Sequence, residues 1–289
     1  WPQPDEIPVA KLATADDRFV TVDGLSLRYR RWGDWDSAGA ATKPTLLLIH
    51  GFGNSLQSFR LLAPELADCC RVIAIDMPGY GLSSKPVEHD YHNGPQGRMM
   101  VAAARALGLE HVIYVGHSLG GAVALQAVVQ DPDVRGLVLL NPGIISTGVP
   151  KIVQLTVPPL PRLSARLFGS RKFRADFLQK SYVNPAIVTP AVIDDVMQGA
   201  RSEGYMTGMT SLMKQYSEGE EIRLAPRVQV PVLIPWGNQD RNKPRSEADE
   251  LQKLLPGSTL VRFEAAGHYV HEEQPAAVAA AIRSWLATL

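Results

Sequence analysis

The sequence predicts an α/β fold: a mostly parallel eight-stranded sheet with helices on both faces, plus a helical cap. Short apolar runs such as residues 45–49 and 111–115 are typical of strands that are covered on both faces. Helical stretches separate these runs, as connections between parallel strands require. Residues 145–225 then interrupt the alternation. With 289 residues, the chain is long enough for one large domain that carries an insertion.

Two patterns predict the eight strands. Residues 19–22 and 25–30 alternate polar and apolar side chains around Asp23-Gly24, which indicates a β-hairpin. The other strands are apolar runs that end in loops. We expect these strands at residues 45–49, 71–75, 111–115, 136–140, 230–237 and 259–263.

Helices are expected in most of the intervals between the strands. Residues 1–17 contain three prolines and are predicted to form an extended surface lead, and residues 85–97 are predicted to be a polar loop. In that loop, His89 and His92 have the spacing of a metal-binding pair, but no third ligand accompanies them, so we expect a solvated loop. The expected core helices are residues 56–67, 98–107, 122–129 and 274–289.

The most informative stretch for function is Gly116-His117-Ser118-Leu119-Gly120. A β-branched strand precedes it and a small-residue helix follows it, so the chain has little room to turn. Gly116 and Gly120 lack a Cβ, which allows the backbone to cross itself closely. Ser118 then occupies the apex with its hydroxyl exposed beside a helix N-terminus, an end that favours negative charge. The pattern predicts a nucleophilic serine, whereas a plain tight turn is the alternative.

This G-x-S-x-G stretch, in its strand–turn–helix context, resembles the nucleophile elbow of the α/β-hydrolase superfamily, in its serine esterase/lipase-like branch. The His50-Gly51 turn after the third strand resembles the oxyanion loop of that family. The resemblance implies that the backbone N–H groups of Phe52 and Leu119 form the oxyanion hole. His50 is expected to brace the loop rather than to act as a catalyst.

The same resemblance implies the remaining members of a catalytic triad. Asp240 follows the seventh strand in a Gly-x-x-Asp loop, and His268 follows the eighth strand in a Gly-His pair, so these are the predicted acid and base. Asp76 precedes the serine, contrary to the family order of nucleophile, acid and base, and is expected to organise its loop instead. Asp249 lies too far into a helix, and His271 is expected to be turned away.

Asn141 follows the sixth strand, where some relatives keep the catalytic acid. An asparagine cannot carry that charge, which moves the expected acid to the loop after the next strand. Substrate contacts are predicted for Asn54, His117 and Trp236. Residues 1–144 and 226–289 are expected to form the core, and residues 145–225 to form a cap that covers the site.

The predicted cap has three helical patches, at residues 165–179, 191–199 and 205–216. One set of its apolar side chains either lines a substrate pocket or packs in the core, and both interpretations are open. Basic residues of the cap are interpreted as a solvated face, with binding of a substrate carboxylate as the alternative. The apolar set is Phe177, Met197, Met206, Met209, Leu212 and Met213, and the basic residues are Arg171, Lys172 and Arg174.

Composition excludes several classes of protein. The 29 Lys and Arg residues balance the 29 Asp and Glu residues, which argues against a nucleic-acid-binding surface. No apolar run approaches the roughly 20 residues that a membrane span needs, so a soluble domain is expected. Cys69 and Cys70 are adjacent and are not expected to form an ordinary disulfide. The first residue is Trp1 rather than a methionine. Removal of a signal peptide, trimming of an anchor and deliberate choice of the first residue would each give this start.

Together these features predict a serine hydrolase that cleaves carboxylic esters of small-to-medium, fairly apolar substrates, with no metal and no organic cofactor. A serine at the elbow, rather than an aspartate, speaks against dehalogenases and epoxide hydrolases of the family. The same triad leaves open a C–C bond hydrolase and a cofactor-free haloperoxidase. A non-catalytic ligand receptor on this fold is a further alternative. The sequence does not indicate the oligomeric state or the cell compartment.

Overall fold

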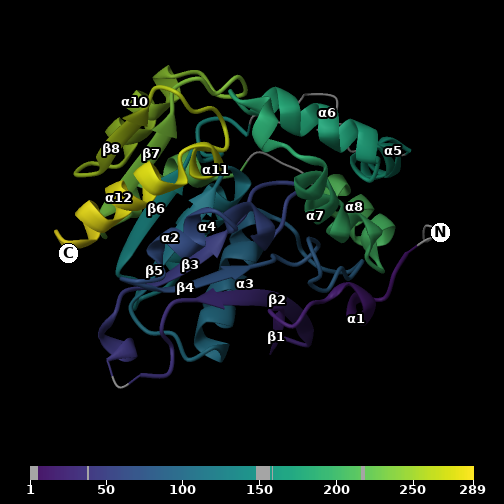
Figure 1. The fold of residues 1–289 in the computed structure, drawn as a ribbon, viewed down its shortest axis with the longest axis horizontal. Helices are drawn as coiled ribbons and strands as arrows, with labels where there is room; N and C mark the ends of the chain where they lie inside the picture. Colours follow the sequence, from purple (N-terminus) through teal and green to yellow (C-terminus); the bar gives the residue numbers. More distant parts are fainter. Residues whose placement is uncertain (1–5, 38, 148–156, 158, 216–218) are drawn as a thin grey trace.

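The computed structural model of the chain describes residues 6–37, 39–147, 157, 159–215 and 219–289. Its centre is one eight-stranded sheet in the order β1-β2-β4-β3-β5-β6-β7-β8 (Figure 1). The pairs β1–β2 and β2–β4 are antiparallel and all other neighbours are parallel, which confirms the predicted fold class. The strands are β1 Arg18–Val22, β2 Leu25–Trp32, β3 Thr45–Ile49, β4 Arg71–Ile75, β5 Val112–His117, β6 Gly136–Leu140, β7 Val232–Gly237 and β8 Thr259–Phe263.

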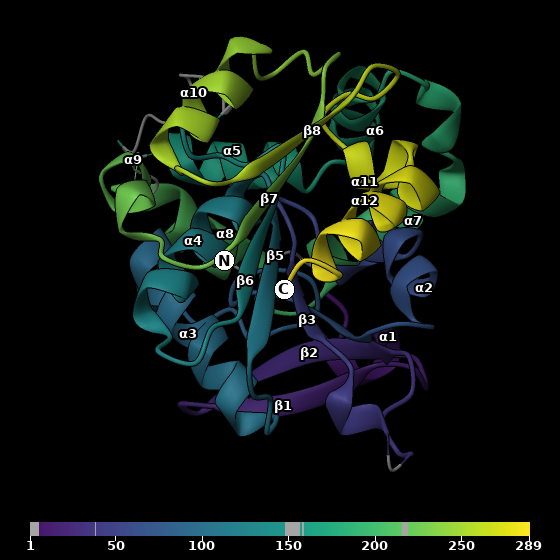
Figure 2. The ribbon, with the colours of Figure 1, turned by 90° about the vertical axis from the view of Figure 1, so that its left-hand side faces the viewer.

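Helices cover both faces of this sheet, as Figure 2 shows. One face carries α3 (Asn93–Ala106), α4 (Leu119–Gln130) and α10 (Ser246–Leu254). The other face carries α2 (Leu62–Leu66) and α12 (Pro275–Leu286). The remaining described helices are α1 Val9–Leu12, η1 Ala40–Thr42, η2 Leu56–Phe59, α5 Leu160–Phe168, α6 Arg171–Ser181, η4 Pro185–Ile187, α7 Pro190–Arg201, α8 Tyr205–Lys214, α9 Glu221–Leu224, η5 Ala225–Arg227 and α11 Val270–Glu273.

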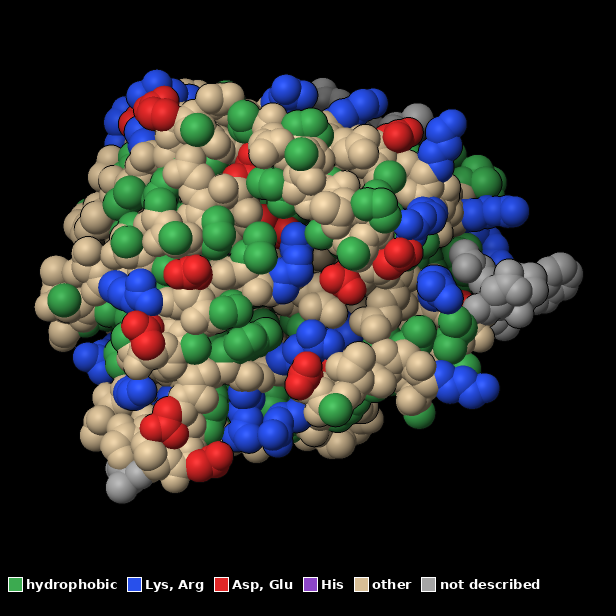
Figure 3. Space-filling view, in the orientation of Figure 1, with side chains coloured by type: hydrophobic (Ala, Val, Ile, Leu, Met, Phe, Trp, Pro, Cys, Tyr) green, Lys and Arg blue, Asp and Glu red, His purple; other side chains and the backbone are tan. Residues whose placement is uncertain are grey.

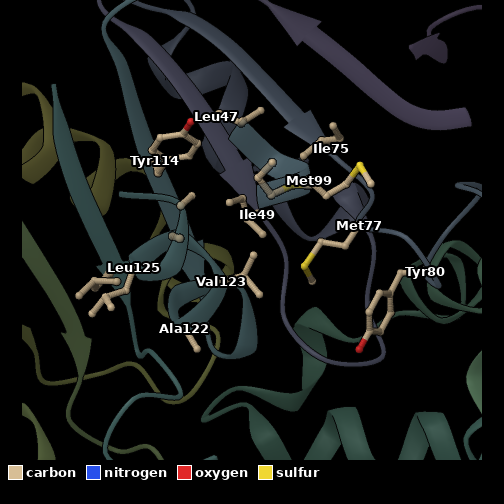
Figure 4. Packing of buried hydrophobic residues seen from close by; sticks show 14 of the residues in the cluster. Leu47, Ile49, Ile75, Met77, Tyr80, Met99, Tyr114, Ala122, Val123 and Leu125 are labelled. Carbon is tan, nitrogen blue, oxygen red and sulfur yellow. The ribbon is translucent and has the colours of Figure 1, made fainter. Parts of the chain in front are cut away.

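Strand β3 shows why the central strands are largely apolar. All five of its residues are buried, and their side chains alternate between the two faces of the sheet. Leu47 and Ile49 join the hydrophobic cluster under α3 and α4, where Figure 4 shows them with Ile75 and Tyr114. The leucines at positions 46 and 48 join the cluster under α2 and α12. Because both faces are packed, four of its five residues are apolar. The exception is Thr45, whose buried hydroxyl accepts a hydrogen bond from Arg71 over 2.7 Å.

Helices α5 to α8 follow β6 along the chain and lie together at one side of the molecule (Figure 1). They contact the loops at the carboxyl ends of β3 and β4. Ser202, after α7, donates its hydroxyl to the carbonyl of Gly81 over 3.1 Å. Arg174, in α6, donates to the carbonyl of Gly53. These contacts fix the helices above the edge of the sheet where the elbow lies.

The N-terminal lead is attached to these same helices. Ile7 forms a parallel β-bridge with Ser202, and the Glu6 carboxylate accepts the backbone N–H groups of Gly204 and Met206 at the start of α8. A carboxylate at a helix N-terminus is electrostatically favourable. Glu6 and Ile7 therefore hold the α7–α8 connection, a contact that the sequence did not predict. The lead is also not extended throughout its described part, because Val9–Leu12 form the short helix α1.

Several predicted elements have different bounds in the structure, and three of them differ for a clear reason. The helix expected at residues 56–67 is split into η2 and α2, since a continuous helix would have Pro64 in its interior. Helix α3 begins at Asn93, five residues before its predicted start, because Pro95 falls in the first turn, where no N–H is needed. The first cap patch is two helices, α5 and α6, that are separated at Gly169-Ser170.

The surface carries charges of both signs, as the balanced composition requires. Figure 3 shows Lys and Arg side chains interspersed with Asp and Glu across one face of the molecule. Within the residues that the structure describes, no helix combines the length and the apolar composition that crossing a membrane demands.

Candidate active site

The predicted elbow is present at the carboxyl end of β5. Ser118 stands between β5 and α4 with φ of 52° and ψ of −120°, a conformation that is strained for a residue with a side chain. A Cβ on Gly116 would lie 2.2 Å from the Gly120 carbonyl oxygen, and a Cβ on Gly120 would lie 2.1 Å from the carbonyl oxygen of Ile49. The two glycines are therefore what allows the chain to turn so tightly.

Ser118, His268 and Asp240 are connected in one hydrogen-bonded relay. The Ser118 Oγ lies 3.0 Å from Nε2 of His268, and Nδ1 of His268 lies 2.7 Å from Oδ2 of Asp240. All three residues are buried, and they come from the ends of β5, β8 and β7. The geometry is that of a nucleophile, a base and the group that orients the base.

The Asp240 carboxylate is held by several donors besides His268. Its Oδ1 accepts the backbone N–H groups of Asn242 (2.8 Å) and Lys243 (3.2 Å), and its Oδ2 accepts the side-chain amide of Asn141 (2.9 Å). Burial raises the pKa of Asp240, but the His268 charge and these hydrogen bonds outweigh it and leave the pKa lowered. The carboxylate therefore stays ionised beside the imidazole.

Asn141 contacts the Asp240 carboxylate, which the sequence did not predict. Its Oδ1 accepts the backbone N–H of Gly237 over 2.9 Å while its amide donates to Asp240. The signal was its position: it directly follows β6, next to the strand that carries the acid. Its backbone has a positive φ of 40°, a conformation that asparagine tolerates better than most residues.

The loop after β3 lies against the elbow. A Cβ on Gly51 would lie 3.1 Å from the Ser118 Cβ, which places the backbone before Phe52 beside the nucleophile. The backbone N–H of Leu119 is the first of helix α4, so it lies at a helix N-terminus and has no partner within the helix. His50 braces the loop as predicted: it accepts the N–H of Met77 at Nε2, and its Nδ1 lies 2.9 Å from the Gly51 carbonyl oxygen.

Asp76 also has the role that the sequence predicted for it. It is fully buried, and its two carboxylate oxygens accept the backbone N–H groups of Leu56 and Leu82. The guanidinium of Arg28 donates to it over 2.7 Å. Asp76 thereby ties together the loops that surround the site, but it does not contact His268.

Two further histidines pack behind the relay. The His117 Nε2 lies 2.9 Å from the His268 carbonyl oxygen, and the His117 ring lies 4.5 Å from that of His271. The His271 Nε2 lies 2.9 Å from the Ser58 hydroxyl, so His271 is turned away from Ser118, as predicted. Burial lowers the pKa of His117 well below its usual value and that of His271 to about 3. Both rings are therefore neutral near pH 7.

Known proteins resemble this chain in sequence and in fold. The sequence profile of the alpha/beta hydrolase fold family matches residues 44–275. The chain belongs to this family. It is 27% identical over 265 residues to the uncharacterized hydrolase YugF of Bacillus subtilis, covering 91% of this chain and 95% of that protein. It is 26% identical over 243 residues to Lipase 1 of Psychrobacter immobilis, covering 81% of this chain and 73% of that protein.

The solved structures agree at the level of the fold. Cfl2 of Burkholderia cenocepacia superimposes on this chain with a TM-score of 0.81 at 24% identity, with 99% of each chain covered. As in other alpha/beta hydrolases, loops at the carboxyl ends of the strands surround the site.

Two adjoining cavities open beside the hydrogen-bonded relay of Ser118, His268 and Asp240. The smaller, of about 40 Å³, is lined by Ser118 and His268 together with Phe168 and Phe177 from α5 and α6. The larger, of about 470 Å³, is lined by Leu119 and by residues of α3, α4, α8 and α9. Both cavities are lined by Phe52 and Thr147, so the larger one begins at the predicted oxyanion hole.

The predicted substrate-binding residues lie in three different places. His117 lines the small cavity next to Ser118. Asn54 lines a separate cavity of only about 10 Å³, and its side chain accepts the N–H of Ser55. Trp236, in β7, is buried, and it lines none of four cavities found among the described residues. Of the three, only His117 lies beside the nucleophile.

The cap side chains divide in a similar way. Phe177 lines the small cavity and Leu212 the large one, whereas Met197, Met206 and Met213 pack in the core. Met209 lines only the smallest cavity, of about 10 Å³. Packing is therefore the main role of this set, which was one of the two interpretations.

Arg174 departs from the expected solvated face. Its side chain is only 4% exposed and donates to the carbonyls of Phe168 and Gly53. Arg171, in contrast, is exposed and pairs with Asp194. The two arginines are nearly on the same side of α6, but Arg171 is the first residue of the helix and pairs at the surface, whereas Arg174 reaches the oxyanion loop.

Among the described residues, no group of three or more His, Cys, Asp or Glu side chains gathers to hold a metal ion. His92 pairs with Asp90 at the surface, while His89 packs edge-on against Tyr91. What the site brings together is a nucleophilic hydroxyl, an oriented imidazole and backbone donors.

Proposed function

We propose that the chain is a carboxylic ester hydrolase that works through an acyl-enzyme on Ser118. The observation that carries the proposal is the continuous relay from Asp240 through His268 to the Ser118 hydroxyl, at 2.7 and 3.0 Å. Its position on a strained elbow beside a helix N-terminus supports the same assignment. The similarity to Lipase 1 of Psychrobacter immobilis supports ester bonds as the target.

In the proposed mechanism, Ser118 attacks the ester carbonyl while His268 takes its proton. The backbone N–H groups of Phe52 and Leu119 stabilise the charge that develops on the carbonyl oxygen, each contributing about 3–4 kcal/mol. His268 then protonates the leaving alcohol and later activates the water that releases the acid. Asp240 keeps the imidazole in the required tautomer and stabilises its cationic form.

Residues 145–225 act as a cap in this proposal, on a core of residues 1–144 and 226–289. Phe168 and Phe177 of the cap line the small cavity with the nucleophile, so the cap shapes the substrate site and limits water. The apolar walls favour small-to-medium esters with little charge near the scissile bond.

Hydrolysis of p-nitrophenyl esters from acetate to octanoate tests the proposal, with the wild-type protein and Ser118→Ala measured side by side. Turnover by the wild type that disappears in the variant supports it. Absence of turnover by a folded wild type overturns the ester assignment. Peroxide-dependent halogenation, or cleavage of a C–C ring-fission product, would then identify the alternative chemistries.

A further inference from the structure

The larger cavity follows one face of α4 away from the elbow. Leu119, Val123 and Gln126 lie on this face at positions i, i+4 and i+7, and all three line the cavity. Figure 4 shows Val123 together with Met77 and Tyr80, which line the same cavity. Seven residues of helix span about 10 Å, so the cavity extends that far from the predicted oxyanion hole.

The far end of this cavity is polar, in contrast to its apolar middle. Glu221, at the start of α9, lines it and is only 2% exposed. One carboxylate oxygen, Oε1, accepts the side-chain amides of Gln126 (2.9 Å) and Asn93 (3.2 Å). These donors anchor the carboxylate to α4 and α3, so its position at the end of the cavity is fixed.

Glu221 has no cationic partner within the described part of the chain. None of the ion pairs among the described residues includes Glu221, and both hydrogen bonds to its carboxylate come from neutral amides and reach a single oxygen. The other charged groups that line the cavity are Arg98 and Glu220, and both are exposed. Burying a carboxylate without a cation is unfavourable, and a cationic ligand group would offset that cost.

We propose that this cavity binds one arm of the substrate, an apolar chain with a terminal ammonium group that pairs with Glu221. The inference rests on the proposed function, because the cavity starts at the predicted oxyanion hole. An extended chain advances about 3.5 Å for every three bonds, so a span of about 10 Å holds eight or nine bonds. The preferred arm is therefore an ω-aminoalkyl chain of about eight carbons.

Matched substrate pairs test this proposal on either side of the ester. One pair is the p-nitrophenyl esters of 8-aminooctanoate and nonanoate, and the other is the acetates of 8-aminooctanol and nonanol. In at least one pair, we expect kcat/KM for the ammonium member to exceed that of the alkyl member by about tenfold or more, as a charge-assisted hydrogen bond provides. An alkyl preference in both pairs overturns the proposal.

The variant Glu221→Gln assigns the effect to this carboxylate. Glutamine keeps an acceptor for Gln126 and Asn93 and removes only the charge, so the tenfold preference should disappear while alkyl esters are still cleaved. Glu220→Gln, an equal change of charge at an exposed position of the same cavity, should retain most of the preference. A preference that survives Glu221→Gln contradicts the assignment.

A binding measurement separates this proposal from the failure of the esterase assignment. Octylammonium and 1-octanol carry no ester and can be titrated into the wild-type protein by calorimetry. Octylammonium should bind at least tenfold more tightly than octanol, and Glu221→Gln should remove the difference. This readout does not need turnover: equal binding of the two compounds overturns the ammonium site, whereas absent ester turnover overturns only the proposed function.

Discussion

The side-chain amide of Asn141 donates to the same carboxylate oxygen of Asp240 that contacts His268. The Oδ1 atom of the same side chain accepts the N–H of Gly237. The Asn141 amide therefore cannot rotate without losing a second hydrogen bond. The asparagine thus holds Oδ2 of Asp240 within hydrogen-bond distance of the imidazole. It is a positioning residue, since it acts on Ser118 only through Asp240 and His268.

Replacing Asn141 by alanine should therefore reduce kcat by about tenfold, with a smaller change in KM. A hydrogen bond to a charged group contributes about 1.5–3 kcal/mol, and part of that is retained through the backbone donors of Asn242 and Lys243. Ester hydrolysis over a range of pH is the measurement. Asn238→Ala serves as the control, because that amide also donates to a carboxylate, Glu264, but at the surface. Equal kcat values for the two variants would contradict a positioning role.

The sequence predicted the sheet and the relay because both are local signals at strand ends. Apolar runs identified the strands, and Ser118, Asp240 and His268 lie in the turns and loops that follow β5, β7 and β8. The contacts of Asn141 and Arg174 could not be predicted from local sequence signals. Their partners, Asp240 and Gly53, lie about a hundred residues away, so only the folded chain brings them together.

The elbow predicts a strong effect for a single added methyl group. In Gly120→Ala the new Cβ would lie 2.1 Å from the Ile49 carbonyl oxygen, and the backbone of a central strand cannot yield. We expect a loss of about 3 kcal/mol or more in the free energy of unfolding, measured by urea denaturation. Gly39→Ala is the control, because its Cβ would meet no atom within 4 Å. A Gly120→Ala protein as stable as that control would rule out the close crossing.

Arg174 links the cap to the oxyanion loop, so its removal should affect both stability and turnover. In Arg174→Met the carbonyls of Gly53 and Phe168 lose their buried donor, which costs about 1–3 kcal/mol. The loop before Asn54 is then less constrained, and we expect kcat to fall severalfold. Arg171→Met removes an exposed pair with Asp194 and should change either quantity little. Similar losses in both variants would show that α6 contributes only general packing.

His271 predicts a specific pH dependence of stability. Burial, followed by the charges of Arg60 and His268, lowers its pKa from 6.5 to about 3. Below pH 6.5 the unfolded chain therefore binds a proton at this histidine that the folded protein does not bind. The stabilisation from the neutral ring is complete above pH 6.5 and is lost progressively as the pH falls toward 3.

The adjacent Glu272 acts in the opposite direction, because burial raises its pKa from 4.5 to about 7. The folded protein keeps this proton to a higher pH than the unfolded chain does, so stability from Glu272 decreases as the pH rises from 4.5 to 7. The two residues partly cancel in the wild type between pH 4.5 and 6.5. Only a comparison with a variant of His271 can separate the two contributions.

In His271→Gln the Glu272 contribution remains and that of the histidine is removed. The difference in unfolding free energy between the wild type and this variant should therefore shrink by about 2–3 kcal/mol as the pH falls from 6.5 to 4.5. Urea denaturation at several pH values measures it. A constant difference across this pH range would mean that His271 accepts a proton in the folded protein as readily as in the unfolded chain.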